Sequence, residues 1–375
     1  MERVRAEVAV IGGGVIGASL AYGLINRNPS VLLIDKENME LTASRGNFGL
    51  VWVQGKGFGM PRYAEWSIEA TEQWPDFASR LQEESGISLD YEKTGGFEIC
   101  LGSNEFEQRK VFIKQMKEQS KDGTYPCEMI TRSELQSKLP EIELGDEVSG
   151  ASLCPHDGFV NPLALLKALL WVFQQKDGKY HPGHSVQNIQ KNGSGFSIET
   201  ESCFFQVDKV VIASGLGTTK LSKMVNMHVP VKPERGQVMV TERTKRVFPF
   251  ATGRLRQNAD GSFMLGASNE DVGYNLETSP EVLSSIASHA IRIFPILKHL
   301  QLIRSWASLR VLTPDQKPVY LESEEYPGAF AVTSHSGVSL ASLHSSHLPE
   351  WILDGKTPLD FEVFHSKRFD VPKTC

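Results

Sequence analysis

The sequence has few cysteines, and none of them is paired with another at a metal-binding spacing. Its five cysteines are odd in number and widely scattered, at positions 100, 127, 154, 203 and 375. Such a set indicates neither a zinc site nor a disulfide framework, and it is typical of a reducing cytosol. Positive charge is also in the minority, because 39 lysines and arginines face 45 acidic residues and leave a net charge of −6. This balance argues against nucleic acid as a partner.

Long apolar runs are missing as well. No stretch approaches the roughly 18–20 apolar residues that a membrane-spanning helix needs. Residues 1–7 lead straight into a strand and lack the apolar core of a secretory signal peptide. We therefore expect a cytoplasmic protein with no transmembrane segment, in which any membrane association is made through partners.

The chain does contain short, fully apolar segments that lie far apart in the sequence. They are Val8–Ile11, Val210–Ala213 and Phe330–Val332. Such runs are typical of parallel strands buried on both faces. The stretches between them are more amphipathic, with predicted helices over 65–84, 104–119, 163–174 and 280–294, a hairpin over 196–207, and a final helix near 339–353. The pattern predicts an α/β protein (α+β overall) in which one domain, built from discontinuous segments, carries an inserted domain with a mixed sheet.

Residues 8–35 contain the clearest motif. Gly12-x-Gly14-x-x-Gly17 follows the first apolar segment and opens a predicted helix over 18–25. Gly12 permits a tight turn, Gly14 lets the backbone approach a pyrophosphate, and Gly17 allows close helix–strand packing. The pyrophosphate would lie at the helix N-terminus. Asp35 ends the next apolar strand, Val31–Ile34, where its carboxylate can accept hydrogen bonds from ribose hydroxyls.

The agreement of strand, helix, second strand and carboxylate makes a glycine-rich turn without a ligand the weaker interpretation. An acidic residue at position 35 also disfavours NADP. The fingerprint does not separate NAD from FAD, but the small, polar, glycine-broken loop at 42–49 suits a backbone wrapped around a long cofactor. We therefore expect a Rossmann-type FAD-binding domain formed by residues 1–90, 145–230 and 306–375. The substrate domain would be formed by residues 91–144 and 231–305.

At this point the sequence resembles the D-amino-acid oxidase-like family of FAD-dependent oxidoreductases, which includes glycine and sarcosine oxidases. The resemblance covers nearly the whole chain. It rests on the fingerprint and on ordered segments at 44–47, 157–162, 211–215, 233–237, 306–310, 313–315 and 335–337. Within the family, residues 49–57, 94–98 and 333–340 look most like the FAD-carrying β subunits of opine oxidase, hydrogen cyanide synthase, and D-hydroxyproline or proline dehydrogenase.

The sequence departs from the family pattern at three points. Asp35 stands where a glutamate is more usual, and Ser339 stands where many relatives have glycine. No cysteine occurs at the late position where monomeric sarcosine oxidases attach their flavin. We therefore expect noncovalent FAD.

The resemblance implies FAD-dependent oxidation of an amino acid or secondary amine of opine, proline/hydroxyproline or sarcosine/glycine type. A hydride would pass from the substrate α-carbon to flavin N5, and the chain would act as the β subunit of a hetero-oligomeric dehydrogenase or oxidase. Partner subunits would hold or share FMN or an iron–sulfur cluster. One alternative is a self-sufficient oxidase of glycine or sarcosine type that releases peroxide. Another is a flavin-holding electron-relay subunit.

Three residues are candidates for the chemistry. Arg310 matches the arginine that binds the substrate carboxylate in the glycine oxidase branch, and a guanidinium can grip a carboxylate with two hydrogen bonds. A structural arginine paired with a nearby acid is the alternative, and it also applies to Arg235. His335 either lines the flavin site or packs as a hydrogen-bonded histidine. Lys56 either affects flavin reactivity or oxygen access, or lies at a surface or subunit contact.

The resemblance also places residues around the cofactor. The turn at Gly337 and Val338 would open the final helix against flavin N1 and O2, and Val186 would lie in the strand that meets adenine. The full predicted cofactor set is Gly12, Gly14, Val15, Ile16, Gly17, Asp35, Lys36, Ser44, Arg45, Gly46, Asn47, Phe48, Gly49, Gln54, Val186, Ser214, Gly215, Ser336, Gly337, Val338 and Ser339. No metal site is expected, because the histidine pairs 181/184 and 344/347 lack a carboxylate or cysteine close in sequence.

Overall fold

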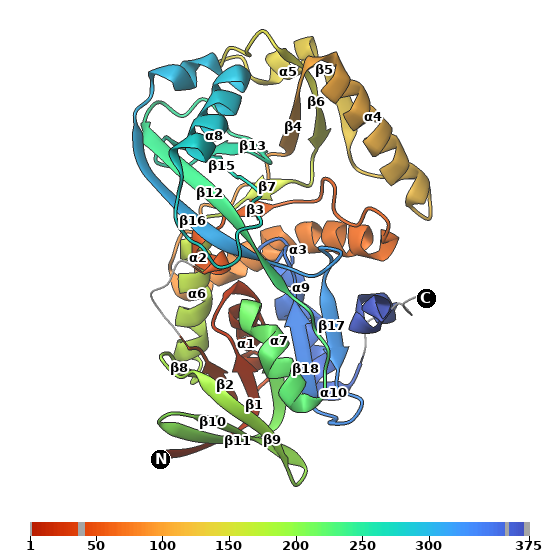
Figure 1. Ribbon diagram of the computed structural model, residues 1–375, viewed down its shortest axis with the longest axis vertical. Helices are drawn as coiled ribbons and strands as arrows, with labels where there is room; N and C mark the ends of the chain where they lie inside the picture. The colour runs from red at the N-terminus through yellow and green to blue at the C-terminus, as the bar shows by residue number, and fades with distance from the viewer. Residues whose placement is uncertain (1, 37–41, 357–359, 371–375) are drawn as a thin grey trace.

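Two eight-stranded sheets organise the part of the chain that the computed structural model describes, residues 2–36, 42–356 and 360–370. The first sheet occupies the lower half of the molecule in Figure 1 and the second occupies the upper half. The first contains β1 (Glu2–Ile11), β2 (Val31–Ile34), β8 (Lys179–His181), β9 (Val186–Asn192), β10 (Gly195–Thr200), β11 (Cys203–Ile212), β17 (Val319–Glu322) and β18 (Ala329–Thr333). The second contains β4 (Gly96–Leu101), β5 (Glu128–Thr131), β6 (Val148–Cys154), β12 (Lys232–Arg243), β13 (Ala251–Thr252), β14 (Leu255–Gln257), β15 (Ser262–Gly266) and β16 (Leu302–Leu312).

The parallel centre of the first sheet consists of β8, β2, β1, β11 and β18, in that order. The three apolar segments predicted from the sequence are neighbours there, with Val10 paired to Val211 and Val211 paired to Phe330. Alternate residues of these strands enter separate apolar clusters on the two faces of the sheet. The prediction of strands buried on both faces is therefore confirmed.

The helices are α1 (Val15–Ile25), α2 (Ala43–Gly46), α3 (Pro61–Ser85), α4 (Gly102–Gln119), α5 (Arg132–Lys138), α6 (Pro162–Gln175), α7 (Thr218–Ser222), α8 (Pro280–Ile293), α9 (Ala341–Ser346) and α10 (Leu348–Asp354). Those predicted over 65–84, 104–119, 163–174 and 280–294 are confirmed with small shifts at their ends. Asn161 caps α6 by accepting hydrogen bonds from the Leu163 and Ala164 N–H groups, each at 3.2 Å.

The final helix differs from its prediction. It does not begin at Gly337, because residues 335–340 form turns and α9 begins at Ala341. Two short helices then replace the single one expected near 339–353. Pro349 lies in the first turn of α10, where its missing N–H and its ring are tolerated. In a continuous helix the same residue would break the ladder of hydrogen bonds.

The two halves meet around α3 and the small sheet formed by β3 (Leu50–Val51) and β7 (Gly158–Phe159) (Figure 1). The division into domains stays a prediction. Strand pairing places β6 and all of β16 in the second sheet, whereas the predicted boundaries grouped residues 145–154 and 306–312 with the first. Within the described residues, every helix is too short or too polar to cross a membrane.

Candidate active site

The carboxyl ends of the parallel strands in the first sheet meet at one edge. Gly12 follows β1 there with a φ of +114°. A Cβ at Gly12 would lie 2.3 Å from the Ala213 carbonyl oxygen, and a Cβ at Gly17 would lie 1.9 Å from the Gly12 carbonyl oxygen. Both positions therefore require glycine. Among the described residues, a Cβ at Gly14 would meet only the Ser44 side chain, 2.7 Å away. The backbone at Gly14 is thus open to a ligand.

The N-terminus of α1 is prepared for an anion. Its N-cap residue, Gly14, has no side chain to cap it, and its first turn contains no acidic residue. The Val15 N–H donates to Ser44 Oγ at 2.8 Å. Gly337 packs so closely on this turn that a Cβ there would lie 2.9 Å from the Ile16 side chain. Because helix N-termini favour negative charge, these residues fit the pyrophosphate of the expected FAD.

Other predicted cofactor residues lie around the same edge. Asp35 follows β2, and a Cβ at Gly13 would lie 2.7 Å from Asp35 Oδ2, so the carboxylate adjoins the glycine turn. Ser214 and Gly215 follow β11, which pairs with β1. Lys36 is exposed. Val186 is buried in β9 and belongs to an apolar cluster that also contains the end of β2.

The loop at 42–49 contains one helical turn, α2, where the sequence predicted only loop. Asn47 shapes its end, because the side chain donates to the Ser44 carbonyl and accepts from the Gly49 N–H, each at 2.8 Å. Arg45 is half-buried, and its side chain makes no hydrogen bond or ion pair within the described residues. This leaves its guanidinium available to an anion.

The second sheet holds this loop through residues that the sequence did not single out individually. Trp306 Nε1 donates to the Gly46 carbonyl at 3.0 Å, and Ser308 Oγ donates to the same oxygen at 3.3 Å. Arg256 Nε donates to the Phe48 carbonyl at 2.8 Å. The alternation along β16 offered a signal for the first two, because residues 306, 308 and 310 must share one face of a strand.

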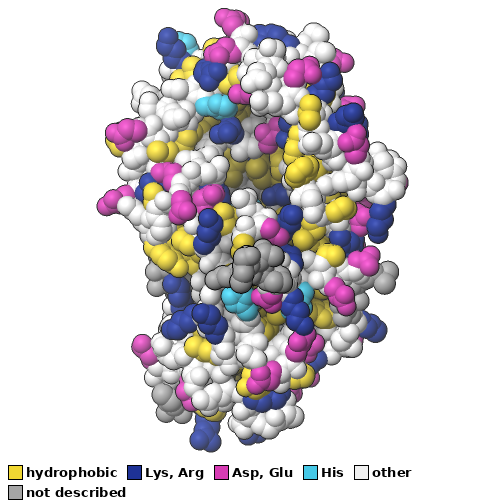
Figure 2. Space-filling view, turned by 45° about the vertical axis from the view of Figure 1, so that its right-hand side comes forward, with side chains coloured by type: hydrophobic (Ala, Val, Ile, Leu, Met, Phe, Trp, Pro, Cys, Tyr) yellow, Lys and Arg dark blue, Asp and Glu magenta, His cyan; other side chains and the backbone are white. Residues whose placement is uncertain are grey.

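Lys56 and His335, both predicted to act in the chemistry, lie close to each other. His335 is exposed among the described residues, although its neighbours Ser334 and Ser336 are buried. Desolvation lowers the pKa of His335 to about 3, and the charges of Lys56 and Arg310 act in the same direction. Neither the Lys56 nor the His335 side chain makes a hydrogen bond or ion pair within the described residues. Figure 2 shows a hollow, lined mainly by hydrophobic side chains, near the level where the two halves meet.

Gln54 has its side chain fully occupied by protein partners. Its Nε2 donates to the Gly96 carbonyl at 3.0 Å and to Asp157 Oδ2 at 2.9 Å. Its Oε1 accepts from Arg109 at 2.9 Å and from Ser152 at 2.6 Å. The side chain therefore joins the two halves of the molecule, and only its backbone is left to contact a cofactor.

Two serines of the final turn are likewise engaged. Ser336 Oγ accepts from the Tyr63 hydroxyl at 2.7 Å. Ser339 Oγ accepts from the Trp52 N–H at 3.0 Å and donates to the Leu50 carbonyl at 3.2 Å. The serine found in place of the family's usual glycine thus connects the turn to β3. Val338 is buried beside it.

Arg310 lies on β16 and is only partly occupied. Its Nη1 is 3.1 Å from Glu234 Oε1, and 21% of the side chain is exposed. Burial lowers its pKa, and Glu234 opposes that shift. Glu234 is thus the nearby acid that a purely structural role of Arg310 would require. Within the described residues, however, the guanidinium makes only one further contact, at 3.4 Å to the Arg235 carbonyl. Arg310 can hold Glu234 and a substrate carboxylate together.

Arg235 is occupied differently. Its Nη2 is 2.6 Å from Glu270 Oε2 in a mostly buried pair, and its Nη1 donates to the Glu277 carbonyl at 2.8 Å. Gln237 donates to the same Glu270 carboxylate. These contacts favour the structural interpretation for Arg235.

The histidine pairs contact protein groups. His344 Nε2 is 2.9 Å from the Tyr320 hydroxyl, and His347 Nε2 is 3.1 Å from Glu69. His184 contacts the Pro182 carbonyl and Cys203. Within the described ranges no three histidine, cysteine or acidic residues gather as metal ligands would.

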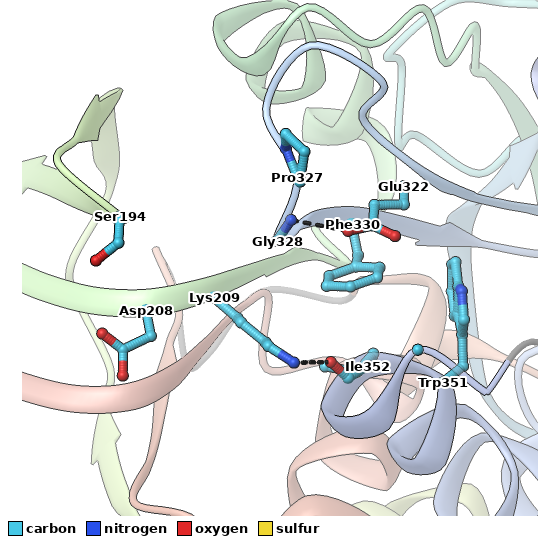
Figure 3. Close-up of a pocket in the computed structure, with 10 residues that line it drawn as sticks. Ser194, Asp208, Lys209, Glu322, Pro327, Gly328, Phe330, Trp351 and Ile352 are labelled. Carbon is cyan, nitrogen blue, oxygen red and sulfur yellow. Dashed lines mark hydrogen bonds between the residues drawn. The ribbon is translucent and has the colours of Figure 1, made fainter.

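A surface groove at the opposite edge of the first sheet is not part of this site (Figure 3). It lies beside Gly328, which precedes β18, whereas ligands of such sheets bind beyond the carboxyl ends of the strands. Its lysine, Lys209, already donates to the Ile352 and Leu353 carbonyls at 2.6 Å. The ammonium therefore satisfies carbonyl groups at the C-terminus of α10.

A test of the Arg310 site comes from Gly236, which lies directly beneath the guanidinium. A Cβ at Gly236 would be 2.7 Å from Arg310 Nη2. We expect Gly236→Ala to displace the guanidinium and raise KM for a carboxylate substrate about 10-fold, the loss of roughly 1.4 kcal/mol of binding. Steady-state kinetics check this. Adding Gly236→Ala to an Arg310→Met protein should change KM no further, and an additive effect would contradict the mechanism.

Asp157 predicts a pH effect on stability. It is fully buried, and desolvation raises its pKa to about 7. The unfolded carboxyl titrates near 3.9, so between about pH 4 and pH 7 the folded chain binds more protons than the unfolded chain. The free energy of unfolding should therefore fall as pH rises through this window, by up to about 4 kcal/mol. Asp157→Asn should make the free energy of unfolding, measured by denaturant titration at several pH values, depend less on pH. An unchanged pH dependence would contradict the assignment to Asp157.

Comparisons with known proteins agree with this geometry. The family model described as FAD dependent oxidoreductase (DAO) matches residues 7–348. An opine oxidase subunit of Agrobacterium tumefaciens is 36% identical over 365 residues, which cover 97% of this chain and 98% of that protein. The hydrogen cyanide synthase subunit HcnC of Pseudomonas aeruginosa is 22% identical, covering 97% and 96% respectively. The crystal structure of glycine oxidase from Bacillus cereus is similar with a TM-score of 0.84 and 26% identity, covering 96% of this chain and 97% of that one. The chain therefore belongs to the DAO family of FAD-dependent oxidoreductases.

Proposed function

We propose that this chain oxidises a secondary amine or amino acid of opine type with noncovalent FAD, as one subunit of a hetero-oligomeric enzyme. One observation carries the proposal: beside the edge that fits the dinucleotide, Lys56 and Arg310 lie near enough for their charges to act on His335, and within the described residues all three side chains keep polar atoms without a protein partner. Two cationic side chains beside a histidine whose pKa is strongly lowered, at the edge that fits the dinucleotide, are typical of a ligand-binding site. FAD, when bound, supplies the hydride acceptor.

These three side chains suit an amine substrate that carries a carboxylate. Arg310 would hold the carboxylate and fix the orientation of the α-carbon. Its charge and that of Lys56 disfavour a second positive charge nearby, so the substrate nitrogen would be bound as the free amine. The free amine is the form whose lone pair assists departure of a hydride. His335, neutral at physiological pH because burial lowers its pKa to about 3, can accept a hydrogen bond from that nitrogen.

The subunit role is supported by the names of the relatives. The opine oxidase relative and the hydrogen cyanide synthase relative are both named as subunits of their enzymes. We propose that this chain also works with partner subunits, which would hold or share FMN or an iron–sulfur cluster as electron acceptors.

Anaerobic reduction of the flavin is the direct test. The FAD-loaded chain would be mixed with opines, proline, hydroxyproline, sarcosine and glycine in the absence of oxygen, and loss of the oxidised flavin absorption would be followed. We expect bleaching by an opine. Absence of bleaching by all of them would overturn the proposal and favour a relay subunit, while fast peroxide release by the isolated chain in air would favour a self-sufficient oxidase.

A further inference from the structure

The turn that carries Lys56 is built to present that one side chain. Gly55 and Gly57, on either side of it, have φ values of +80° and +77°, a conformation that favours glycine. A Cβ at Gly57 would lie 2.2 Å from the Ala64 backbone nitrogen, so the turn packs directly on α3. The Tyr125 hydroxyl holds the other side, accepting from the Gly55 N–H at 3.0 Å. The lysine is therefore carried by a rigid support rather than by a mobile loop.

The ammonium group of Lys56 has no counter-ion in the described chain. The acid whose charge acts on it is Asp157, but no Lys56–Asp157 contact falls within ion-pair distance. Both Asp157 oxygens already accept other hydrogen bonds, from the Val53 N–H at 2.5 Å and from Gln54 at 2.9 Å. Desolvation lowers the pKa of Lys56 to about 8. The residue is half-buried. A half-buried ammonium with a lowered pKa and no counter-ion in the described chain is open to an anionic ligand.

Lys56 and Arg310 approach His335 from different elements. Lys56 comes from the turn after β3, Arg310 comes from β16, and His335 follows β18. Both positive charges act on the His335 ring. Under the proposed function, Arg310 binds one carboxylate of the substrate. The positive charge of Lys56 then still lacks an anionic partner among the described residues.

We propose that Lys56 binds a second carboxylate of the substrate, so that the site selects secondary amines with a carboxylate on each side of the nitrogen. This inference rests on the proposed function and narrows its substrate class. In such a molecule the two carboxylates lie on opposite sides of the amine. Arg310 and Lys56 then hold the two ends, and the nitrogen lies between them beside His335.

The test compares N-(1-carboxyethyl)-alanine with its mono-amide, which has the same shape but one carboxylate less. In the FAD-loaded protein, the second-order rate constant of anaerobic flavin bleaching should be about 30-fold higher for the dicarboxylate. This is the factor expected for one desolvated charge pair. Lys56→Met should bring the ratio between the two compounds close to 1, and Lys56→Arg should restore part of the preference for the dicarboxylate. Lys110→Met, at an exposed lysine of α4, is the control and should match the wild type.

Binding without turnover gives a second readout. Calorimetry on the dithionite-reduced protein without oxygen should show the dissociation constant of the dicarboxylate rising about 30-fold in Lys56→Met. Equal use of both compounds by the wild type would overturn the inference and leave the proposed function intact. An equal loss for both compounds in Lys56→Met, with a changed flavin spectrum, would assign the lysine to the flavin and also overturn it. Bleaching by neither compound or by any other amine would instead overturn the proposed function.

Discussion

Replacement of Arg310 by methionine is expected to lower kcat/KM for the amine substrate about 1,000-fold while the protein stays folded. The guanidinium is mostly buried, and a bidentate contact with a carboxylate in such a place is strong. Truncating one partner of a buried charge pair costs about 2–5 kcal/mol, and about 4 kcal/mol corresponds to this loss. The loss should fall mainly on KM, because the contact already forms with the bound substrate. Steady-state kinetics and thermal unfolding of the FAD-loaded protein would measure both quantities.

Two variants separate binding from structure. Arg304→Met removes an exposed arginine from the same strand and should change kcat/KM less than about 2-fold. Glu234→Gln frees Arg310 from its ion pair and should preserve substrate binding. If Arg310→Met lowered thermal stability and left KM unchanged, the arginine would be structural, and the carboxylate would bind elsewhere.

Replacement of Gly14 by alanine is expected to leave a folded protein that binds FAD about 100-fold more weakly. In the structure the added Cβ would meet only the end of the Ser44 side chain, which can rotate, so the fold should tolerate it. A pyrophosphate needs the backbone at this position, and the methyl group would hold it away from the N–H groups of α1. Two weakened hydrogen bonds to a charged ligand account for about 3 kcal/mol. Fluorescence titration of the apoprotein with FAD would give the affinity.

Gly12→Ala provides the contrast. Its Cβ would lie 2.3 Å from a backbone oxygen at a φ of +114°, so the fold itself should be destabilised. Gly14→Ala should therefore keep its unfolding temperature as apoprotein, and Gly12→Ala should not. Unchanged FAD affinity in folded Gly14→Ala would contradict the placement of the pyrophosphate.

The dinucleotide turn was predictable because its strands, glycines, helix and carboxylate all lie within residues 8–35. The glycines at 12 and 17 touch a backbone only a few residues away or in the adjacent strand, so their spacing carries the geometry. The buried strands and the longer helices followed from hydrophobic periodicity for the same reason. The start of the final helix was misplaced, because residues 335–340 are held by contacts to α3 and β3 that periodicity does not record.

Other features depended on pairs that are distant in sequence. Gln54 resembled a cofactor ligand, but its side chain is occupied by Arg109, Ser152 and Asp157. The contacts of Trp306 and Arg256 with the loop at 42–49 likewise join segments about two hundred or more residues apart. No local pattern encodes such contacts, since they exist only when the two sheets come together.

The sequence alone determines that this chain carries a dinucleotide-binding unit, because glycine spacing, strand order and the terminal carboxylate are properties of one short segment. Tertiary structure alone decides which polar groups remain unsatisfied. It pairs Arg235 with Glu270 and buries Gln54. Within the described residues it leaves the side chains of Lys56 and His335 without hydrogen bonds or ion pairs, and that of Arg310 only partly bonded. The physical reason is that a residue's burial and its hydrogen-bond partners depend on how distant segments pack together. This packing decides which polar side chains bond to other protein groups and which are available to a substrate.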